Sequence, residues 1–493
     1  MKTYRPYTPT QAYLLPPSPL EWLPSDHLAY FILDLVAELD LGAIERALQA
    51  KDARGERPYS PRMMTGLLMY GYAVGVFSSR KIERATVEDV AFRILAGNQR
   101  PHFTTVNEFR AKHREALAGL FVQVLRECQS AGLVKLGHVA IDGTKMKANA
   151  SKHKAMSYER MNKDEERLKA EVASLFERAE AIDAAEDAEY GVGQSSHDLP
   201  AELRRREDRL AKIREVRAAL KEEAAKARAG ELRAQAESLR EKAADPSTAA
   251  KEQGYFNTLA AKRDAAAKKL DDDDQDPPTA QGTLPLSRPP TTKDGSPKPN
   301  AQRNFTDPDS RIMLRDGSFL QAYNAQIAVD EDHQIIVAAA VSNHAADTGY
   351  LVPMLERVVE NCDAVPERTT ADAGYFSASN VRAAEHMGTE PFISVGKHHN
   401  DGTQAKLPAH YNTPTRLSMR ALLHSPRGRA AYARRKATVE PVFGQIRSCR
   451  GFRAFSFRGL LKTGCEWLFV CLTHNVLKLW RHALAVASAP VAT

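Results

Sequence analysis

The sequence predicts a mixed α/β protein whose sheet follows a helical region and is interrupted by a long helical segment. Short apolar runs typical of buried strands occur only near 138–144 and between 319 and 395. Between them lies a polar stretch rich in Ala, Glu, Lys and Arg. At 493 residues the chain has room for two or three domains. We expect a helical domain at 1–135, a first strand at 136–154, a helical insertion at 155–272, a flexible linker at 273–303, the rest of the sheet domain at 304–482 and a tail at 483–493.

Residues 1–135 carry the signals of several short helices. Ser60-Pro61 pairs an N-cap residue with proline at the first helical position, and Thr105–Glu108 resembles a capping box that would start a later helix. Short helices joined by tight turns and carrying basic residues are typical of helix-turn-helix DNA-binding domains. A helical packing or dimerisation domain is the alternative.

The strand signals occur in an order that indicates one sheet topology. A first strand is followed, after the insertion, by an antiparallel hairpin and then by strands that alternate with helices. This order favours a ribonuclease-H-like mixed sheet. The expected strands are His138–Thr144, Phe319–Asp330, Gln334–Val341, Arg368–Ala371 and Pro391–Val395, and the expected helices between them are Leu351–Asn361 and Ser379–His386.

The insertion contains a partial heptad pattern, which predicts a helical hairpin or coiled coil. Its apolar positions are Leu199, Leu203, Leu210, Ile213 and Leu220. Arg206 and Arg217 interrupt this seam. The simplest role is that of a spacer, and dimerisation or DNA clamping is the alternative.

Charge and cysteine content limit the classes of function. The net charge of +7 favours polyanionic partners, and residues 425–481 hold twelve Lys or Arg against Glu440 and Glu466 alone. Five scattered cysteines without a C-x-x-C pair argue against a disulfide framework or a zinc site. Because no signal-peptide pattern or membrane-length apolar run is present, we expect a soluble, cytoplasmic protein.

Three acidic residues have the setting of metal ligands. Asp142 and Asp372 each follow a short apolar run, and strand ends hold a side chain rigidly while opening to solvent. Glu440 lies in a basic helical segment and shares a stripe with Lys436 and Arg447. Converging carboxylates hold two Mg²⁺ ions about 4 Å apart in enzymes that cleave phosphodiesters. An ordinary ion pair between Lys436 and Glu440 is the alternative.

These segments resemble the acidic motifs of bacterial insertion-sequence DDE transposases. The matching stretches are Ile141–Lys145, Thr370–Tyr375, and the Tyr, Arg, Glu and basic positions between Tyr432 and Arg447. The closest resemblance is to the insertion-sequence group eleven-eighty-two, which carries a helical domain directly after the first catalytic strand. The resemblance covers roughly residues 10–155 and 300–480.

The resemblance implies that Asp142, Asp372 and Glu440 bind two Mg²⁺ ions, which Mn²⁺ would replace, and that Tyr432, Arg435 and Arg447 position DNA phosphates. It also implies binding of terminal inverted repeats and target DNA by a homodimer or higher assembly. The expected reaction cuts the transposon end by hydrolysis, after which the freed 3′-hydroxyl attacks target DNA. The motif has lysine where this chain has Arg447, and its Tyr–Glu spacing is one residue shorter.

The residue pattern, apart from the family resemblance, indicates further candidates for DNA or metal binding. Lys436 flanks Glu440 as a phosphate-binding cation, and Arg450 and Arg453 alternate with phenylalanines as in nucleic-acid-binding surfaces. Core aromatics with a basic edge would give the same pattern. A metal cluster is one interpretation of His398–Asp401, but the pattern favours a solvated loop. Two functional alternatives remain, namely a nuclease of the same fold that does not join strands and an inactive DNA-binding protein.

Overall fold

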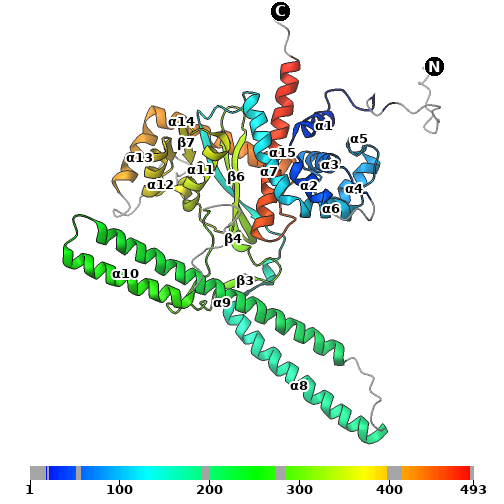
Figure 1. The fold of residues 1–493 in the computed structure, drawn as a ribbon, viewed down its shortest axis with the longest axis vertical. Helices are drawn as coiled ribbons and strands as arrows, with labels where there is room; N and C mark the ends of the chain where they lie inside the picture. The colour runs from blue at the N-terminus through cyan, green and yellow to red at the C-terminus, as the bar shows by residue number, and fades with distance from the viewer. Residues whose placement is uncertain are drawn as a thin grey trace, which may run out of the picture.

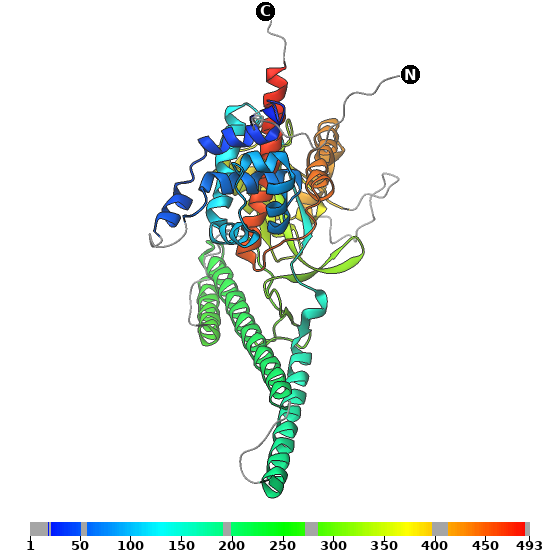
Figure 2. The same ribbon diagram turned by 90° about the vertical axis from the view of Figure 1, so that its right-hand side faces the viewer.

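A computed structural model describes residues 18, 21–50, 57–190, 199–271, 284–396 and 413–488. They form a mostly helical body around one mixed sheet, from which two helical arms project (Figures 1 and 2). The predicted mixed α/β class is confirmed. His398–Asp401 lies outside the described residues.

The sheet has six strands in the order β4-β5-β1-β7-β8, with β6 paired to β5. β1 pairs antiparallel with β5 and parallel with β7, and β7 pairs parallel with β8. The five predicted strands are confirmed, whereas β4 was not predicted. The strands are β1 (Val139–Lys147), β4 (Arg311–Arg315), β5 (Ser318–Asp330), β6 (Ile336–Ser342), β7 (Arg368–Ala371) and β8 (Glu390–Ile393).

The amino-terminal region is helical as expected, but one predicted helix start is wrong. Thr105–Glu108 lies inside α6, which His102 caps by accepting a bond from the Thr104 backbone N–H. A break at His113 then separates α6 from α7. The helices are α1 (Leu28–Glu38), α2 (Gly42–Gln49), α3 (Pro61–Val74), α4 (Ser79–Glu88), α5 (Val90–Leu95), α6 (Phe103–Lys112) and α7 (Arg114–Ser130).

The amino-terminal helices share one hydrophobic core with the sheet. Leu68 and Phe121 belong to the same buried cluster as Trp467 of α15 (Leu460–Ala487). Tyr72 adds a polar link, because its hydroxyl lies 2.9 Å from the Arg110 guanidinium and 3.3 Å from the buried Glu466 carboxylate. Burial across this boundary therefore fixes the helical region against the sheet.

Two arms project from the body, and they share α9 (Leu199–Ala244). α8 (Tyr158–Tyr190) packs along one half of α9, and α10 (Ala250–Leu270) packs along the other (Figure 1). The predicted seam residues Leu210, Ile213 and Leu220 are buried against α8.

The arginines that interrupt the heptad seam have acidic partners on α8. Arg206 Nε lies 3.0 Å from Glu171 Oε2, and Arg217 is ion-paired with the buried Glu165. The α8–α9 interface is thus polar at these two levels and apolar between them.

Part of the expected linker is packed against the sheet domain. Leu284 lies in the main core, and the Ser287 backbone N–H donates to Asn343 Oδ1 at 2.8 Å. Farther along, β3 (Gln302–Asn304) pairs antiparallel with β2 (Ala155–Ser157). This small sheet joins the two ends of the insertion.

The carboxyl-terminal helices cover the sheet and carry the last acidic motif. α14 packs against β1, β5, β7 and β8, and α15 packs against β6. Pro441 has no N–H for the Ala437 carbonyl, which accepts a bond from Gln334 Nε2 at 2.9 Å instead. The elements are 3₁₀ turns η3 (Thr348–Tyr350) and η4 (Ala373–Tyr375), helices α11 (Leu351–Cys362), α12 (Ala378–Met387), α13 (Pro414–His424) and α14 (Pro426–Gly444), and the π-helical turn η6 (Gln445–Cys449). Among the described residues, none of the helices has the length and apolarity needed to cross a membrane.

Candidate active site

Two of the predicted carboxylates lie side by side at the rim of the sheet. β1 and β7 run parallel, with Ala140 opposite Thr370. β7 ends at Ala371, so Asp372 follows its last residue while Asp142 continues β1 two residues beyond Ala140. The Asp372 carboxylate raises the pKa of Asp142 electrostatically, as expected for neighbouring acids.

Asp142 is a largely buried acid with one cationic partner. Its Oδ2 accepts a bond of 2.9 Å from Arg435 Nη1 on α14, and its Oδ1 accepts one of 2.8 Å from the Gly143 backbone N–H. Burial raises the pKa of Asp142 to about 6, although Arg435 and the Gly143 N–H act in the opposite direction. The negative charge at this point is therefore only partly compensated.

Two glycines leave space for polar side chains at the site. A Cβ atom on Gly143 would lie 2.1 Å from Gln326 Nε2, so any side chain there would displace the Gln326 amide. A Cβ atom on Gly374 would lie 3.0 Å from Asp372 Oδ1 and 3.4 Å from Asp347 Oδ2. Both carboxylates therefore border the same small space beside Gly374.

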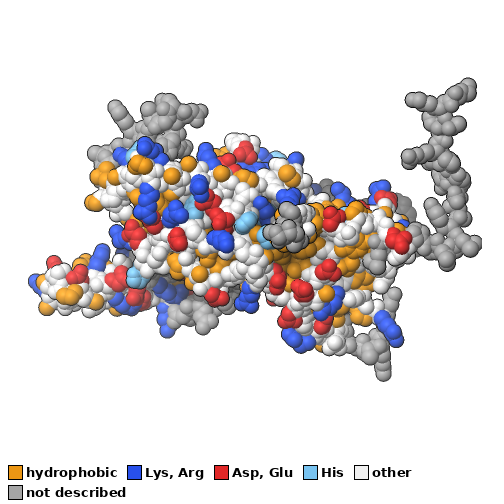
Figure 3. Space-filling model, turned by 90° about the horizontal axis from the view of Figure 1, so that it is seen from above, with side chains coloured by type: hydrophobic (Ala, Val, Ile, Leu, Met, Phe, Trp, Pro, Cys, Tyr) orange, Lys and Arg blue, Asp and Glu red, His pale blue; other side chains and the backbone are white. Residues whose placement is uncertain are grey.

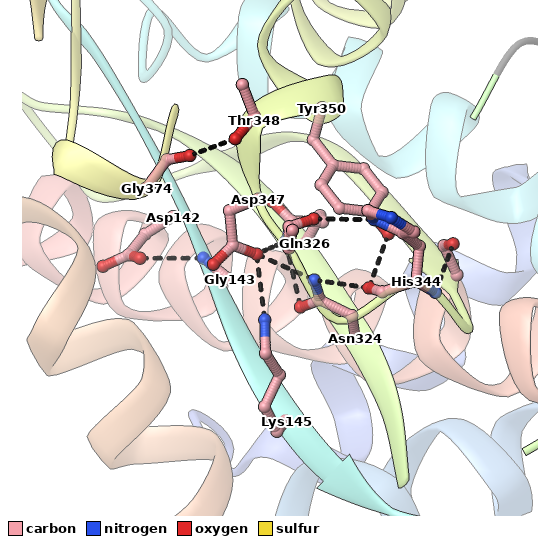
Figure 4. Close-up of polar contacts among 12 residues, drawn as sticks. Asp142, Gly143, Lys145, Asn324, Gln326, His344, Asp347, Thr348, Tyr350 and Gly374 are labelled. Carbon is pink, nitrogen blue, oxygen red and sulfur yellow. Dashed lines mark hydrogen bonds and ion pairs between the residues drawn. The ribbon is translucent and has the colours of Figure 1, made fainter. Parts of the chain in front are cut away.

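Asp347, which sequence reasoning missed, lies in the loop between β6 and η3 (Figure 4). Its Oδ1 accepts bonds from Lys145 Nζ at 2.9 Å, Asn324 Nδ2 at 2.7 Å and Gln326 Nε2 at 3.1 Å. The available signal was that the largely apolar strand β5 carries buried amide residues, Asn324 and Gln326 among them, since buried polar side chains require partners.

Tyr375 is a buried residue close to the three aspartates. Its hydroxyl is fully buried and donates to Gln326 Oε1. Burial raises the pKa of Tyr375 well above its usual value, and the charges of Asp347, Asp142 and Asp372 raise it further. The three carboxylates, from separate segments of the chain, therefore lie near enough to one phenol to affect its pKa.

Glu440 is held differently from the aspartates. Arg435 of α14 contacts Asp142, and Arg447 of η6 contacts Thr144, so the helical segment that holds Glu440 runs beside the site. However, Glu440 is exposed, and five helical positions place it about 140° around the helix from Arg435. Among the described residues, no three His, Cys, Asp or Glu side chains are gathered as ligands of one ion. The structure thus brings Asp142 and Asp372 together but leaves Glu440 turned to solvent.

Comparisons with known families identify the chain. The profile of the family described as Transposase DDE domain matches residues 304–476, and that of a second family, Transposase domain (DUF772), matches residues 18–112. The two segments together span more than half of the chain. The chain is a DDE transposase. No curated protein and no solved structure matches it.

The transposase therefore acts in transposition, through DNA cleavage and strand transfer. Enzymes of this family use divalent metal ions. Asp142, Asp347 and Asp372 offer the oxygen donors that hard divalent cations prefer, and their charges are incompletely neutralised. The chemistry of these residues fits such an ion. Asp142 itself lies outside both matched segments.

The residues of α14 and η6 that were expected to contact DNA have different settings in the transposase. Arg435 is buried against Asp142, with its guanidinium carbon 5.8 Å from the ring centroid of the half-buried Tyr432. Lys436 is exposed, and no ion pair with Glu440 occurs among the described residues. Arg447 is partly exposed, and its Nη1 lies 3.3 Å from Thr144 Oγ1. Viewed from above, Lys and Arg side chains are interspersed with acidic ones over α13 and α14 (Figure 3).

Arg450 does not belong to the DNA-contacting set, and that prediction is wrong. The residue is 5% exposed, and its guanidinium donates to Thr473 Oγ1 at 2.7 Å and to the Val470 carbonyl at 3.2 Å. The phenylalanines around it pack in the core, which produced a pattern similar to that of a nucleic-acid-binding surface. By contrast, Arg453 is exposed.

Proposed function

We propose that Asp142, Asp372 and Glu440 form the catalytic site of this transposase and hold two Mg²⁺ ions. The observation that carries the proposal is the parallel register that sets Asp142 beside Asp372 at the end of β7. Antiparallel pairing of β6, β5 and β1, followed by parallel β7 and β8, supports a ribonuclease-H-like catalytic domain. When bound, such ions activate the attacking oxygen and stabilise the leaving one.

The surrounding residues have separate roles in this proposal. Arg435 holds the Asp142 carboxylate in the DNA-free protein. Glu440 joins the aspartates by a change of side-chain rotamer or a small movement of α14 when DNA binds. The exposed Lys436 and Arg453, with Arg447 and Tyr432, contact phosphates of the transposon end.

The remaining parts serve DNA recognition and assembly. We propose that the amino-terminal helices bind the terminal inverted repeats and that the coiled-coil-like insertion spaces or clamps the DNA. The transposase would act as a homodimer or higher assembly on its ends and target. In a bacterial cell it would work in the cytoplasm, at the nucleoid.

Strand cleavage and strand transfer by aspartate variants test the proposal. Asp142→Asn and Asp372→Asn should each reduce cleavage of a paired-end substrate by about a thousandfold or more, because they weaken metal binding and transition-state stabilisation. Binding of the ends, measured by gel shift, should remain. Asp363→Asn is the matched control, since Asp363 is exposed with φ of 54°, a conformation that asparagine tolerates.

The reaction products separate the alternatives. Joined products on a sequencing gel support transposition, whereas cut but unjoined ends support a nuclease of the same fold. Wild-type protein that binds ends but neither cuts them nor binds Mn²⁺ in calorimetry would be an inactive DNA-binding protein. Full cleavage by either aspartate variant would reject the assignment.

A further inference from the structure

Asp347 is anchored through one carboxylate oxygen only. Three donors from β1 and β5 converge on Oδ1, and Lys145 supplies one positive charge among them (Figure 4). Asp347 occupies the N-cap position of η3, yet its side chain makes no capping bond there. The carboxylate is thus turned away from its own helix turn and towards the sheet.

The second oxygen of Asp347 lies on the side of Asp372. Oδ2 has no hydrogen-bond donor in the described part of the chain. It lies 3.4 Å from the point that a Cβ atom on Gly374 would occupy, and Asp372 Oδ1 lies 3.0 Å from that same point. A bond of 2.9 Å from Thr348 Oγ1 to the Gly374 carbonyl joins the two turns, so the approach of these carboxylates is fixed by the fold.

Asp347 and Asp142 reach the rim of the sheet from opposite faces. Asp142 and Lys145 are three positions apart on β1, and side chains alternate along a strand, so they point to opposite sides. α14 contacts Asp142 on one face, and the Asp347 loop contacts Lys145 on the other. β7 ends at Ala371 and pairs with β1 only at Val139 and Ala140, so Asp372 lies beyond the strand, at the rim where the two faces meet.

We propose that Asp347 is a further metal ligand of the transposase, binding a divalent cation through Oδ2 together with Asp372. This inference rests on the proposed function, because it assigns one more ligand to that site. The three donors on Oδ1 then pre-orient the free oxygen, as neighbouring groups do for metal ligands. The role of Lys145 is to hold the carboxylate while the cation is absent.

Calorimetric titration of the full DNA-free chain with Mn²⁺ tests this ligand. Asp347→Asn keeps an acceptor for the three donors but loses the charge, and it should weaken Mn²⁺ affinity about tenfold or more. Asp363→Asn, at the other end of α11, should leave the affinity unchanged. Lys145→Met should not weaken it, because this change removes a competing cation.

A measurement on the wild-type protein removes dependence on any variant that fails to fold. Fe²⁺ in place of the metal, with ascorbate and peroxide, generates radicals that cut the backbone near the ion. We expect cuts close to Asp347 as well as close to Asp142 and Asp372. Thermal unfolding of the Asp347→Asn variant should shift upward less than that of the wild type at the same Mn²⁺ concentration.

The outcomes distinguish this inference from the proposed function. If Asp142→Asn weakens Mn²⁺ binding and Asp347→Asn does not, Asp347 is not a ligand, but the proposed site stands. Loss of cleavage by Asp347→Asn with unchanged Mn²⁺ affinity would likewise overturn the ligand role and leave only a positioning role. If neither variant changes Mn²⁺ binding, the proposed site fails, and this inference fails with it.

Discussion

The acids on the sheet and the acid on α14 differ in how they are held. Asp142, Asp347 and Asp372 each accept at least one hydrogen bond of 2.9 Å or shorter from a neighbouring element or turn. Glu440 is exposed, and its carboxylate receives no hydrogen bond from the described residues. Strand ends and tight turns thus supply oriented carboxylates, whereas an exposed helical position leaves the side chain free.

This difference teaches which ligands exist before substrate arrives. Ordering a long exposed side chain such as that of glutamate costs up to about 2 kcal/mol of rotamer entropy. The aspartate side chains are already ordered in the folded protein, but the Glu440 side chain is not. We therefore expect the sheet to bind a cation first and α14 to complete the site when DNA neutralises its basic surroundings.

The largest expected effect is at Glu440, where a substitution should lower strand cleavage but not metal binding. Glu440→Gln should reduce strand cleavage by about a hundredfold or more while changing the Mn²⁺ affinity of DNA-free protein little. Asp142→Asn should reduce both. Calorimetry without DNA and a cleavage assay with paired ends measure the two quantities. An equal loss of Mn²⁺ affinity in both variants would remove the distinction between helix and sheet.

The next effect concerns Arg435 of α14, which forms an ion pair with Asp142 of β1. Arg435→Gln leaves Asp142 largely buried without its partner, which should lower the free energy of unfolding by about 3 kcal/mol. Mn²⁺ should restore part of this loss. Arg434→Gln is the matched control, because Arg434 is exposed and its pairing with Glu331 contributes below about 1 kcal/mol. Denaturation curves with and without Mn²⁺ provide the test, and equal losses in the two variants would contradict it.

Acidification should weaken metal binding through Asp142. Its pKa is raised to about 6 by burial, so protons compete with a cation for this carboxylate below that pH. Mn²⁺ affinity should therefore fall about tenfold per pH unit below about pH 6 and level off above it. The pH dependence should flatten in Asp142→Asn. A transition near pH 4 in the wild type would show that burial does not raise this pKa.

The smallest effect compares the two arginines that follow η6. Arg453→Gln should lower the salt slope of the DNA-binding constant by the amount expected for about one phosphate contact, because Arg453 is exposed. Arg450→Gln should leave the salt slope unchanged, since its guanidinium is buried among α15 groups. Fluorescence anisotropy over a range of salt concentrations measures both slopes. If Arg450→Gln also reduces the salt slope of DNA binding while the protein stays folded, Arg450 contacts DNA after all.

Local sequence patterns were sufficient where an element carries its own signal. β1, β5 and β7 were predicted from apolar runs and their ends, and the seam of α9 was predicted from its heptads. The exposed apolar residues of β4, including Leu314 at 57% exposure, gave no buried-strand pattern. The break at His113 was missed because helical periodicity continues across it.

The sequence by itself determined the acidic strand ends and the basic, helical character of the segment around Glu440. Only the tertiary structure decided that Asp347 joins Asp142 and Asp372, because its donors come from β1 and β5, which are distant in the chain. Tertiary packing also decided that Arg450 is buried while Arg453 is exposed. The physical reason is that a residue's type limits its chemistry, whereas its neighbours and its burial depend on which distant elements pack around it.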